Sequence, residues 1–356
     1  MKKTNREKKE WQKRKQLKII NKQIKATNKS SGKKVITGAL IISPYMLCIY
    51  DDHYYEDAIN FFKKISRKIL KEKKKITIDF SRLESVTAAA ILCLYAEIHR
   101  CIQLSEIDHP IRYIKPRHAE PRRVLNELKF FAGINNPSYD VIHEGTIGVI
   151  PCTSGTKADN KLDDLMNSIE NNIYGGEINE EGDNTLYRSL SEAMLNVWQH
   201  AYKSSRIKKD EIDRLGKRWW ILGHRIEDNL YLAIYDRGIG IPEALPFKYT
   251  KEVIDKFLDF LKLKNRSDAN MIHAAMEIGR TGTGKQGRGK GLQDVRRFVE
   301  ENPSGVLRIY SNRGGYVYRM EGDKIEHHSR KHSLRGTLIQ WNVKLTNNSS
   351  EIKNDG

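Results

Sequence analysis

Apolar positions in residues 185–203 have the spacing of an amphipathic α-helix. These positions, four, three and four residues apart, are Leu190, Met194, Val197 and Ala201. We expect this face to pack on a sheet. Glu192, Asn196 and His200 share the opposite face, which therefore carries a carboxylate, an amide and an imidazole in line. Taken alone, the pattern fits a polar surface stripe as well as a ligand site, and Ser189 with Glu192 can form a capping box.

The region that follows this helix alternates between strand-like and helix-like stretches. The predicted strands are 218–226, 230–235, 306–310, 316–320 and 336–345, and the first two form a hairpin. The predicted helices are 251–263, 271–279 and 293–300. We therefore expect residues 184–346 to form an α/β sandwich, with a mixed, mostly antiparallel sheet and helices on one face.

Residues 35–135 predict a separate, small α/β domain. Its strands are expected at 35–42, 45–50, 75–80 and 111–114, and its helices at 55–71, 87–104 and 122–131. Residues 136–183 are rich in Asn, Gly, Asp, Glu, Ser and Pro, which indicates a connector, with one strand at 145–151 and one short helix at 163–173. Residues 347–356 form a C-terminal tail.

Positive charge is concentrated at the beginning of the chain. The net charge is +18 over 356 residues, and residues 1–34 contribute +12 of it through 12 Lys, 2 Arg and 2 Glu. Such a basic tail binds nucleic acid, a membrane surface or an acidic partner, or it is a solvated extension. Trp11 is its one aromatic residue, so a stacking platform for bases is not supported.

The chain has the composition of a globular protein, with 38% hydrophobic and 30% charged residues. No apolar run approaches the roughly 18 residues of a membrane span. The most apolar candidate, residues 88–96, predicts a buried helix, and no apolar core of a secretory signal follows the basic start. Cys48, Cys93, Cys101 and Cys152 form no Cys-x-x-Cys pair, so we expect reduced thiols in a cytoplasmic protein.

Two glycine-containing segments stand near the predicted sheet. Asp236 ends a strand and is followed by Gly238 and Gly240, which suits close approach of a ligand but equally a tight turn. Residues 282–292 are dense in glycine and lead into a helix, an arrangement that binds phosphate. This segment is not a P-loop, because Gly291 stands where Ser or Thr is required.

Four motifs in order resemble the GHKL family of ATP-binding domains, which includes gyrase, heat-shock chaperones, histidine kinases and MutL. The matching positions are Glu192, Asn196, His200 and Ala201 (N box); Asp236, Gly238 and Gly240 (first glycine box); Gly287, Gly289 and Gly291 (second glycine box); and Gly336-Thr337. Within this family, the segment 191–202 is most similar to the corresponding segment of the anti-sigma-factor serine kinases. The resemblance implies an ATP site that depends on magnesium.

The resemblance also implies a role for each matching residue. Asp236 accepts from the adenine amino group, with Thr337 nearby through water. Asn196 is a magnesium ligand, and Glu192 orients or deprotonates the attacking water or hydroxyl. Gly287, Gly289 and Gly291 close over the phosphates as a lid. The cations in and beside the lid are candidate charge partners of the γ-phosphate or are only solvated: Lys285, Arg288 and Lys290. Leu292 is a further nucleotide-binding position. His200 either touches phosphate or is structural, and the structural role is favoured.

Residues around Asp79 resemble, over a short stretch, the STAS domain of anti-anti-sigma factors. The order is strand, Asp79, loop and buried helix. The family's phosphorylatable hydroxyl falls on Ala89, so the resemblance implies that this switch is lost. Ser85 and Thr87 are instead expected to cap the helix.

These observations predict a magnesium-dependent ATP-binding switch protein. It hydrolyses ATP or transfers the γ-phosphate to a protein Ser or Thr, and its N-terminal domain regulates it or binds a partner. The alternative is a protein associated with nucleic acid or a complex, anchored by residues 1–34, whose ATP site gates conformation. A third possibility is binding without turnover. A histidine kinase is disfavoured, because no long helix pair with an acceptor His precedes residue 184.

Overall fold

A computed structural model describes residues 38–135, 142–143, 146–154, 166–171, 180–203, 207, 209–278 and 291–345. By its internal contacts the chain divides into two units, Met1–Ala39 and Leu40–Gly356. Only Gly38 and Ala39 of the first unit are described, so the basic tail and its predicted roles lie outside the described residues. No described helix is long and apolar enough to cross a bilayer.

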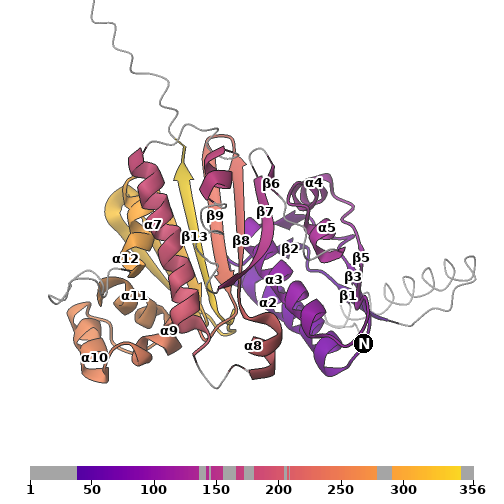
Figure 1. The fold of residues 1–356 in the computed structure, drawn as a ribbon, viewed down its shortest axis with the longest axis horizontal. Helices are drawn as coiled ribbons and strands as arrows, with labels where there is room; N and C mark the ends of the chain where they lie inside the picture. Colours follow the sequence, from indigo (N-terminus) through magenta and orange to yellow (C-terminus); the bar gives the residue numbers. More distant parts are fainter. Residues whose placement is uncertain are drawn as a thin grey trace, which may run out of the picture. The chain divides into compact units, whose positions relative to one another are not determined.

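The N-terminal part of the second unit has the predicted alternation of strands and helices (Figure 1). Its strands are β1 (Ala39–Ile42), β2 (Met46–Leu47), β3 (Ile76–Asp79), β4 (Ser85–Val86) and β5 (Ile111–Ile114). Its helices are α2 (Asp52–Ser66), continued by the turn η1 (Arg67–Lys71), then α3 (Ala88–Leu104), α4 (Ala119–Glu127) and α5 (Phe130–Asn135). The order β1-β3-β5 forms one sheet, in which β3 and β5 are parallel, and β2 pairs with β4.

Two expectations for this part can be compared with the structure. Thr87 caps α3, because its side chain accepts from the Ala90 N–H, whereas Ser85 lies in β4. The single helix expected at 122–131 is wrong: α4 and α5 are separated at Lys129, whose φ is +48°. The break places both Phe130 and Phe131 against Phe80, with ring centroids 6.1 Å apart in each pair.

The large sheet has eight strands in the order β12-β11-β10-β13-β9-β8-β7-β6. Their bounds are β6 (Ile142–His143), β7 (Thr146–Ser154), β8 (Lys217–Ile226), β9 (Asn229–Asp236), β10 (Val306–Ser311), β11 (Gly314–Arg319), β12 (Lys324–Ser329) and β13 (Thr337–Lys344). Every pair is antiparallel, so the expected mixed sheet is wrong for the described strands. The strand predicted in the connector is β7, which extends this sheet beside β8.

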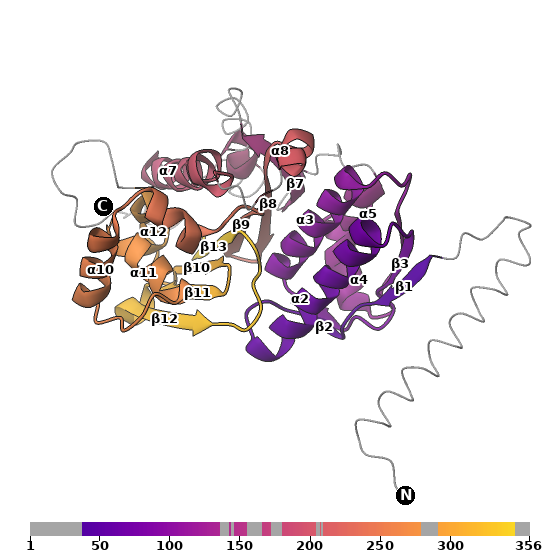
Figure 2. The same ribbon diagram turned by 90° about the horizontal axis from the view of Figure 1, so that it is seen from below.

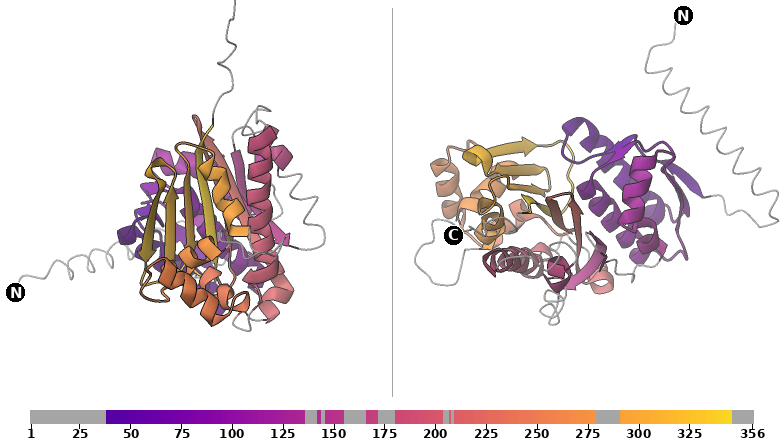
Figure 3. Two further views of the ribbon diagram at one scale, coloured as in Figure 1. Left: turned by 90° about the vertical axis from the view of Figure 1, so that its left-hand side faces the viewer. Right: turned by 90° about the horizontal axis from the view of Figure 1, so that it is seen from above.

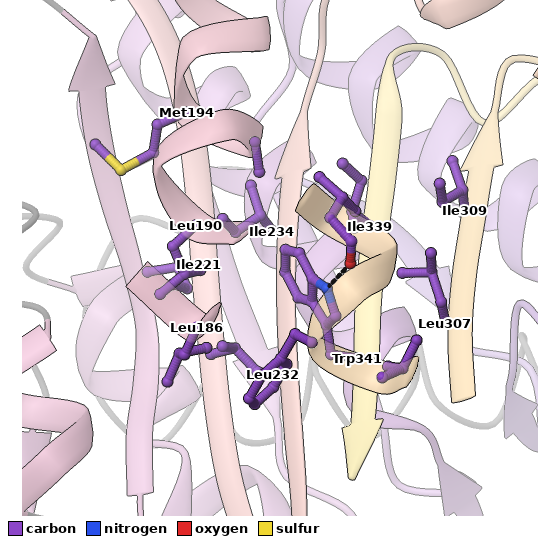
Figure 4. Packing of buried hydrophobic residues seen from close by; sticks show 14 of the residues in the cluster. Leu186, Leu190, Met194, Ile221, Leu232, Ile234, Leu307, Ile309, Ile339 and Trp341 are labelled. Carbon is purple, nitrogen blue, oxygen red and sulfur yellow. Dashed lines mark hydrogen bonds between the residues drawn. The ribbon is translucent and has the colours of Figure 1, made fainter. Parts of the chain in front are cut away.

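One face of this sheet is covered by α7 (Glu180–Asn196), which ends in the wider turn η3 (Val197–Ala201), and by α11 (Asp268–Ile278) and α12 (Gly291–Glu300). The predicted apolar face of α7 is confirmed, since Leu190, Met194, Val197 and Ala201 are all in the core. Figure 4 shows Leu190 and Met194 on the side of the sheet that bears Ile221, Leu232 and Ile234. The Trp341 indole donates to the carbonyl of Val295 on α12 at 2.7 Å (Figure 4).

The opposite face of β8 and β9 packs against α3 (Figures 2 and 3). Trp220 and Tyr235 are fully buried there, and the rings of Trp220 and His99 lie 5.9 Å apart. The expectation of helices on one face concerned residues 184–346, and the helix on the opposite face comes from the N-terminal part, a contact that the sequence did not predict. Strands buried on both faces have nearly continuous apolar sequences, and β8 and β9 have them, because each lies between two layers.

The remaining helices lie beside the site described next. They are α8 (Lys209–Leu215), α9 (Ile241–Ala244), the short turn η4 (Leu245–Phe247) and α10 (Lys251–Phe260). A further short turn, η5 (Glu321–Asp323), joins β11 to β12. Cys48, Cys93 and Cys101 are buried and free.

Candidate functional site

Three neighbouring strands of the sheet, β10, β13 and β9, have a polar residue at the same end. These three side chains form a row. Asp236, the last residue of β9, is the register partner of Thr337, the first of β13. Thr337 is in turn paired with Ser311, the last residue of β10. Antiparallel pairing therefore places a carboxylate and two hydroxyls side by side, although they are far apart in the sequence.

Glycines allow the backbone to close tightly around this row. A Cβ at Gly238 would lie 2.2 Å from the Ala201 carbonyl oxygen, so the turn after β9 packs directly on the end of α7. The next N–H, that of Ile239, donates to the same Ala201 oxygen at 2.8 Å. Gly336 has φ +83°, and a Cβ there would lie 2.0 Å from the Asp236 carbonyl oxygen. Both positions require glycine.

Hydrogen bonds fix the floor of the site. The Gly238 N–H donates to Asp236 Oδ1 at 2.7 Å. Ser311 Oγ lies 3.0 Å from Thr337 Oγ1 and accepts from the Ile241 N–H at 2.8 Å. Ser311 was not identified from the sequence, because a serine at the end of a strand has no distinguishing pattern. It ties β10, β13 and α9 together, and so it positions Thr337.

Asp236 is only 5% exposed. Burial raises the pKa of its carboxyl to about 7, against the opposing effects of the Gly238 and Thr337 backbone N–H groups and of Arg237. Desolvation has the largest effect on this pKa, because the removal of the carboxylate from water destabilises the ionised form more than these contacts stabilise it. A ligand that donates a hydrogen bond to Asp236 would favour the ionised form.

Asn196 and Glu192 stand together on α7. Asn196 Nδ2 donates to Glu192 Oε1 at 3.2 Å, which leaves Asn196 Oδ1 without a donor among the described residues. Burial raises the pKa of Glu192, and Asp294 adds to the shift, while Lys248 and the hydrogen bond from Asn196 oppose it. A raised pKa makes this carboxylate a better proton acceptor than an exposed glutamate.

His200 lies in η3, the wider π-helical turn that follows α7. Wider turns of this kind occur frequently at functional sites. Its side chain lines the pocket beside Asn196. Burial lowers its pKa, and the nearby Lys248 and Lys203 lower it further, so the imidazole is neutral at neutral pH. A neutral ring is a weak phosphate ligand, which agrees with the structural role that was favoured.

These elements enclose a pocket of about 800 Å³, measured to its open mouth. Its walls are mainly apolar: Ala193, Val197, Ile234, Ile241, Leu245, Leu292 and Ile339. Its polar groups are few and convergent, namely Asn196, His200, Asp236, Lys248 and Thr337. An apolar cavity with a few convergent polar groups is typical of a small-molecule site.

Lys248 and Tyr249 also line the pocket, but no sequence pattern identified them as site residues. They follow η4 and reach the pocket because Pro242 and the short helical turns fold residues 241–249 back over it. Lys248 is exposed, and its charge acts on both Glu192 and His200. Only the proline near the first glycine box offered a signal for this arrangement.

The predicted lid is mostly beyond the part of the chain that the structure describes. Lys285, Gly287, Arg288, Gly289 and Lys290 lie outside the described residues. Gly291 is the first residue of α12, and Leu292 lines the pocket. The pocket and the start of α12 are therefore adjacent, and the role of the lid residues stays a prediction.

Arg237, next to Asp236, links the site to the N-terminal part through buried charges. Arg237 Nη2 lies 2.9 Å from Glu97 Oε2 on α3, and Glu97 Oε1 lies 3.5 Å from Arg100 Nη1. Arg100 also forms a two-pronged pair with Glu211 on α8, with Nη2 to Oε2 at 2.8 Å. Glu97 is 3% exposed. The turn after β9 is thus connected to α3 and α8.

The pocket also suits a hydrated magnesium ion. Among the described residues, no three His, Cys, Asp or Glu side chains gather as a metal site. Magnesium in nucleotide sites needs only one or two protein oxygens, because water and phosphate complete its shell. Asn196 Oδ1 can provide such an oxygen, so the residues present fit a nucleotide-bound ion rather than one held by protein alone.

The arrangement can hold a flat ring against apolar walls and accept a hydrogen bond at its floor. Glu192 does not line the pocket, but it accepts a hydrogen bond from Asn196, which does. No protein-family model matches the chain, and a search of curated proteins returned no match.

Proposed function

We propose that residues 184–346 form a GHKL-type domain that binds ATP with magnesium, and that the chain hydrolyses ATP or transfers its γ-phosphate to a protein Ser or Thr. The observation that carries this proposal is Asp236, a buried carboxyl at the floor of an apolar pocket. The two backbone N–H groups that contact this carboxyl only partly compensate its burial, so a ligand that donates a further hydrogen bond would be favoured. An adenine amino group is such a donor.

The walls support the same ligand. Adenine is flat and apolar on its faces, which suits the space between Val197, Ile241 and Ile339. Its amino group would donate to Asp236, whose Oδ1 is already oriented by the Gly238 N–H. Thr337 Oγ1, held by Ser311, would complete the ring's polar contacts through water.

The phosphates would extend toward Asn196, Glu192 and Lys248 at the other end of the pocket. A bound magnesium ion would neutralise phosphate charge and hold the β- and γ-phosphates in a reactive geometry. Asn196 Oδ1 would bind that ion, and Lys248 would pair with a phosphate oxygen. Glu192 would take the proton of the attacking water or hydroxyl as the new O–P bond forms and the bond to the β-phosphate oxygen breaks.

Incubation with γ-labelled ATP tests this proposal, first with the chain alone and then with added protein acceptors. Free labelled phosphate supports hydrolysis, and label on a protein supports transfer. Glu192→Gln is the matched control, because it keeps the size and hydrogen-bonding ability of the side chain and removes its basicity. If the chain neither binds nor consumes ATP, the proposal is wrong.

Residues 35–135, the segment that resembles a STAS domain, would act as the regulatory part. The packing of α3 on β8 and β9 and the pair Arg237–Glu97 support this role, since both connect the segment to the nucleotide pocket. Regulation by this segment would not involve phosphorylation at position 89, because Ala89 has no hydroxyl and is buried.

A second function is favoured by the charge of residues 1–34: attachment of the ATP-binding part to nucleic acid or to a larger complex. Phosphate contacts would make such binding fall steeply with salt. If deletion of residues 1–34 leaves both nucleic-acid affinity and its salt dependence unchanged, this function is excluded.

A further inference from the structure

A second hollow lies on the other side of the turn that closes the nucleotide pocket. Arg237, Gly238 and Ile239 line it, whereas Asp236 and Gly240 line the nucleotide pocket. Its floor is formed by three turns at one end of the large sheet, 237–239, 312–313 and 329–335, and its walls by residues 66–73, α8 and residues 266–268. We refer to it as the basic cleft.

The basic cleft is lined by nine Lys or Arg and five Asp or Glu side chains. Several of the cations are compensated: Arg237 and Arg100 by Glu97 and Glu211, and Arg266 by Asp255. These pairs are part of the structure and leave little charge for a ligand.

Other cations of the basic cleft have no counter-charge. Among the described residues, no carboxylate lies within ion-pairing distance of Arg313, Arg335 or Lys71, and all three are exposed. Arg214 donates only to the carbonyls of Gln103 and Leu104, so its charge is also uncompensated. The cleft therefore has an excess of positive charge on side chains that a ligand can reach.

The backbone holds Arg313 and Arg335 near each other. The Leu334 N–H donates to the Asn312 carbonyl, and the Arg330 N–H to the Arg313 carbonyl, both at 2.8 Å, so residues 330–334 wrap around the turn that bears Arg313. Arg335 has φ +61°, an uncommon conformation for a residue with a side chain. Its carbonyl accepts from the Tyr235 hydroxyl at 2.8 Å. Both arginines are exposed, so an acidic ligand can reach both of their side chains.

The chemistry of the lining favours an acidic polypeptide over other anions. The hollow has a volume of about 1100 Å³, at the upper limit of the roughly 300–1,000 Å³ of small-ligand pockets, so it has room for a peptide segment. No described lining residue is aromatic, so bases would find no stacking partner. Asp210 and Asp268 also line the cleft, so its lining is not uniformly basic, as a site for a continuous phosphate backbone would be. Arginine guanidinium groups instead match separate carboxylates in a two-pronged manner.

We propose that the basic cleft binds an acidic segment of a partner polypeptide, with Arg313 and Arg335 as its principal contacts. This inference does not require the nucleotide site to be active. Because the turn 237–239 lies between the cleft and the nucleotide pocket, the segment would lie next to the bound nucleotide without entering its pocket.

The test uses the full chain and a fluorescent Glu-rich peptide, with a peptide in which every Glu is Gln as the reference ligand. The double variant Arg313→Gln, Arg335→Asn removes both charges, and Asn tolerates the backbone conformation at position 335. The double variant Lys256→Gln, Lys324→Gln is the matched control, since both lysines are exposed and line neither hollow. Anisotropy gives the affinities, and denaturation curves confirm that both variants fold.

We expect the Glu-rich peptide to bind more tightly than the Gln peptide, and the cleft variant to weaken that binding about tenfold. The control variant should change it less than about twofold. A photo-crosslinker on the peptide should attach to residues 66–73, 266–268 or 312–335. Equal affinities of the cleft and control variants, or attachment confined to residues 1–34, overturn the proposal. Tighter binding of a single-stranded oligonucleotide that the cleft variant weakens would overturn it in favour of nucleic acid.

Discussion

Replacing Asp236 by asparagine isolates the charge at the floor of the nucleotide pocket. The substitution Asp236→Asn keeps the shape of the side chain and an oxygen that can accept from the Gly238 N–H. It removes a carboxyl that is 5% exposed and has a pKa of about 7. Two opposite effects are expected, a gain in stability of the ligand-free protein and a loss of ATP affinity.

The size of the stability effect follows from the pKa. An aspartate raised from 3.8 to about 7 binds its proton more tightly in the folded than in the unfolded chain. Its stabilising contribution is therefore complete below the unfolded pKa and is lost as the pH rises to the folded pKa. At about 1.36 kcal/mol per unit of pKa, the loss above pH 7 is on the order of 4 kcal/mol.

Denaturant unfolding of the ligand-free protein at an acidic and a mildly alkaline pH measures this effect. The asparagine variant should be more stable than the parent at the alkaline pH, by up to about 4 kcal/mol, and the advantage should shrink as Asp236 becomes protonated. A variant that is less stable than the parent at alkaline pH, or a difference that does not change with pH, would refute the view that Asp236 is a desolvated carboxyl.

ATP affinity gives the second measurement on the same pair of proteins. Because the amino group of adenine needs an ionised acceptor, affinity should fall about tenfold for each pH unit below the pKa of Asp236. Calorimetry in buffers with different ionisation enthalpies should detect proton release on binding near pH 7. The asparagine variant should bind weakly and should lack the part of the pH dependence that comes from this proton. An equal pH dependence in both proteins would contradict the assigned pocket.

Further predictions concern the wall, the floor and the outer face of the sheet. Glu192→Gln should abolish turnover with nearly unchanged ATP affinity, and turnover of the parent should fall as the pH drops through the raised pKa of Glu192. If the variant retains turnover in steady-state assays, Glu192 is not the base. Asn196→Ala should abolish the magnesium dependence of ATP binding, and an unchanged dependence in calorimetry would show that the ion binds elsewhere. Gly336→Ala should cost at least about 1–2 kcal/mol in a denaturation experiment, since its φ is +83° and the new Cβ would lie 2.0 Å from a carbonyl oxygen. Trp220→Ala should cost about 3–5 kcal/mol, because the indole is fully buried, and a loss below about 1 kcal/mol would mean that α3 does not cover this face.

The sequence predicts best those elements whose own residues carry a clear apolar pattern. The core face of α7 follows from its helical spacing, and β9 and β13 follow from long apolar runs. The pairing of Asp236 with Thr337 brings together two positions that the motifs had selected independently.

Other features could not be predicted, either because their own residues have no clear apolar pattern or because they depend on distant contacts. The edge strand β12 has the sequence Lys-Ile-Glu-His-His-Ser and is mostly exposed or half-buried, so it has no strong apolar pattern. Lys248 reaches the pocket only through the folding of residues 241–249 over it. The coverage of Trp220 and Tyr235 by α3 depends on contacts between segments more than a hundred residues apart.

The double coverage of β8 and β9 ties the large sheet to the N-terminal part of the chain. A fragment that begins after α5 would expose the Trp220 indole and the Tyr235 ring to water, so we expect the sheet with its pocket to be unstable when α3 is absent. The buried pair between Glu97 and Arg237 joins the same helix to the residue beside Asp236, so a displacement of α3 would reach this turn through that pair.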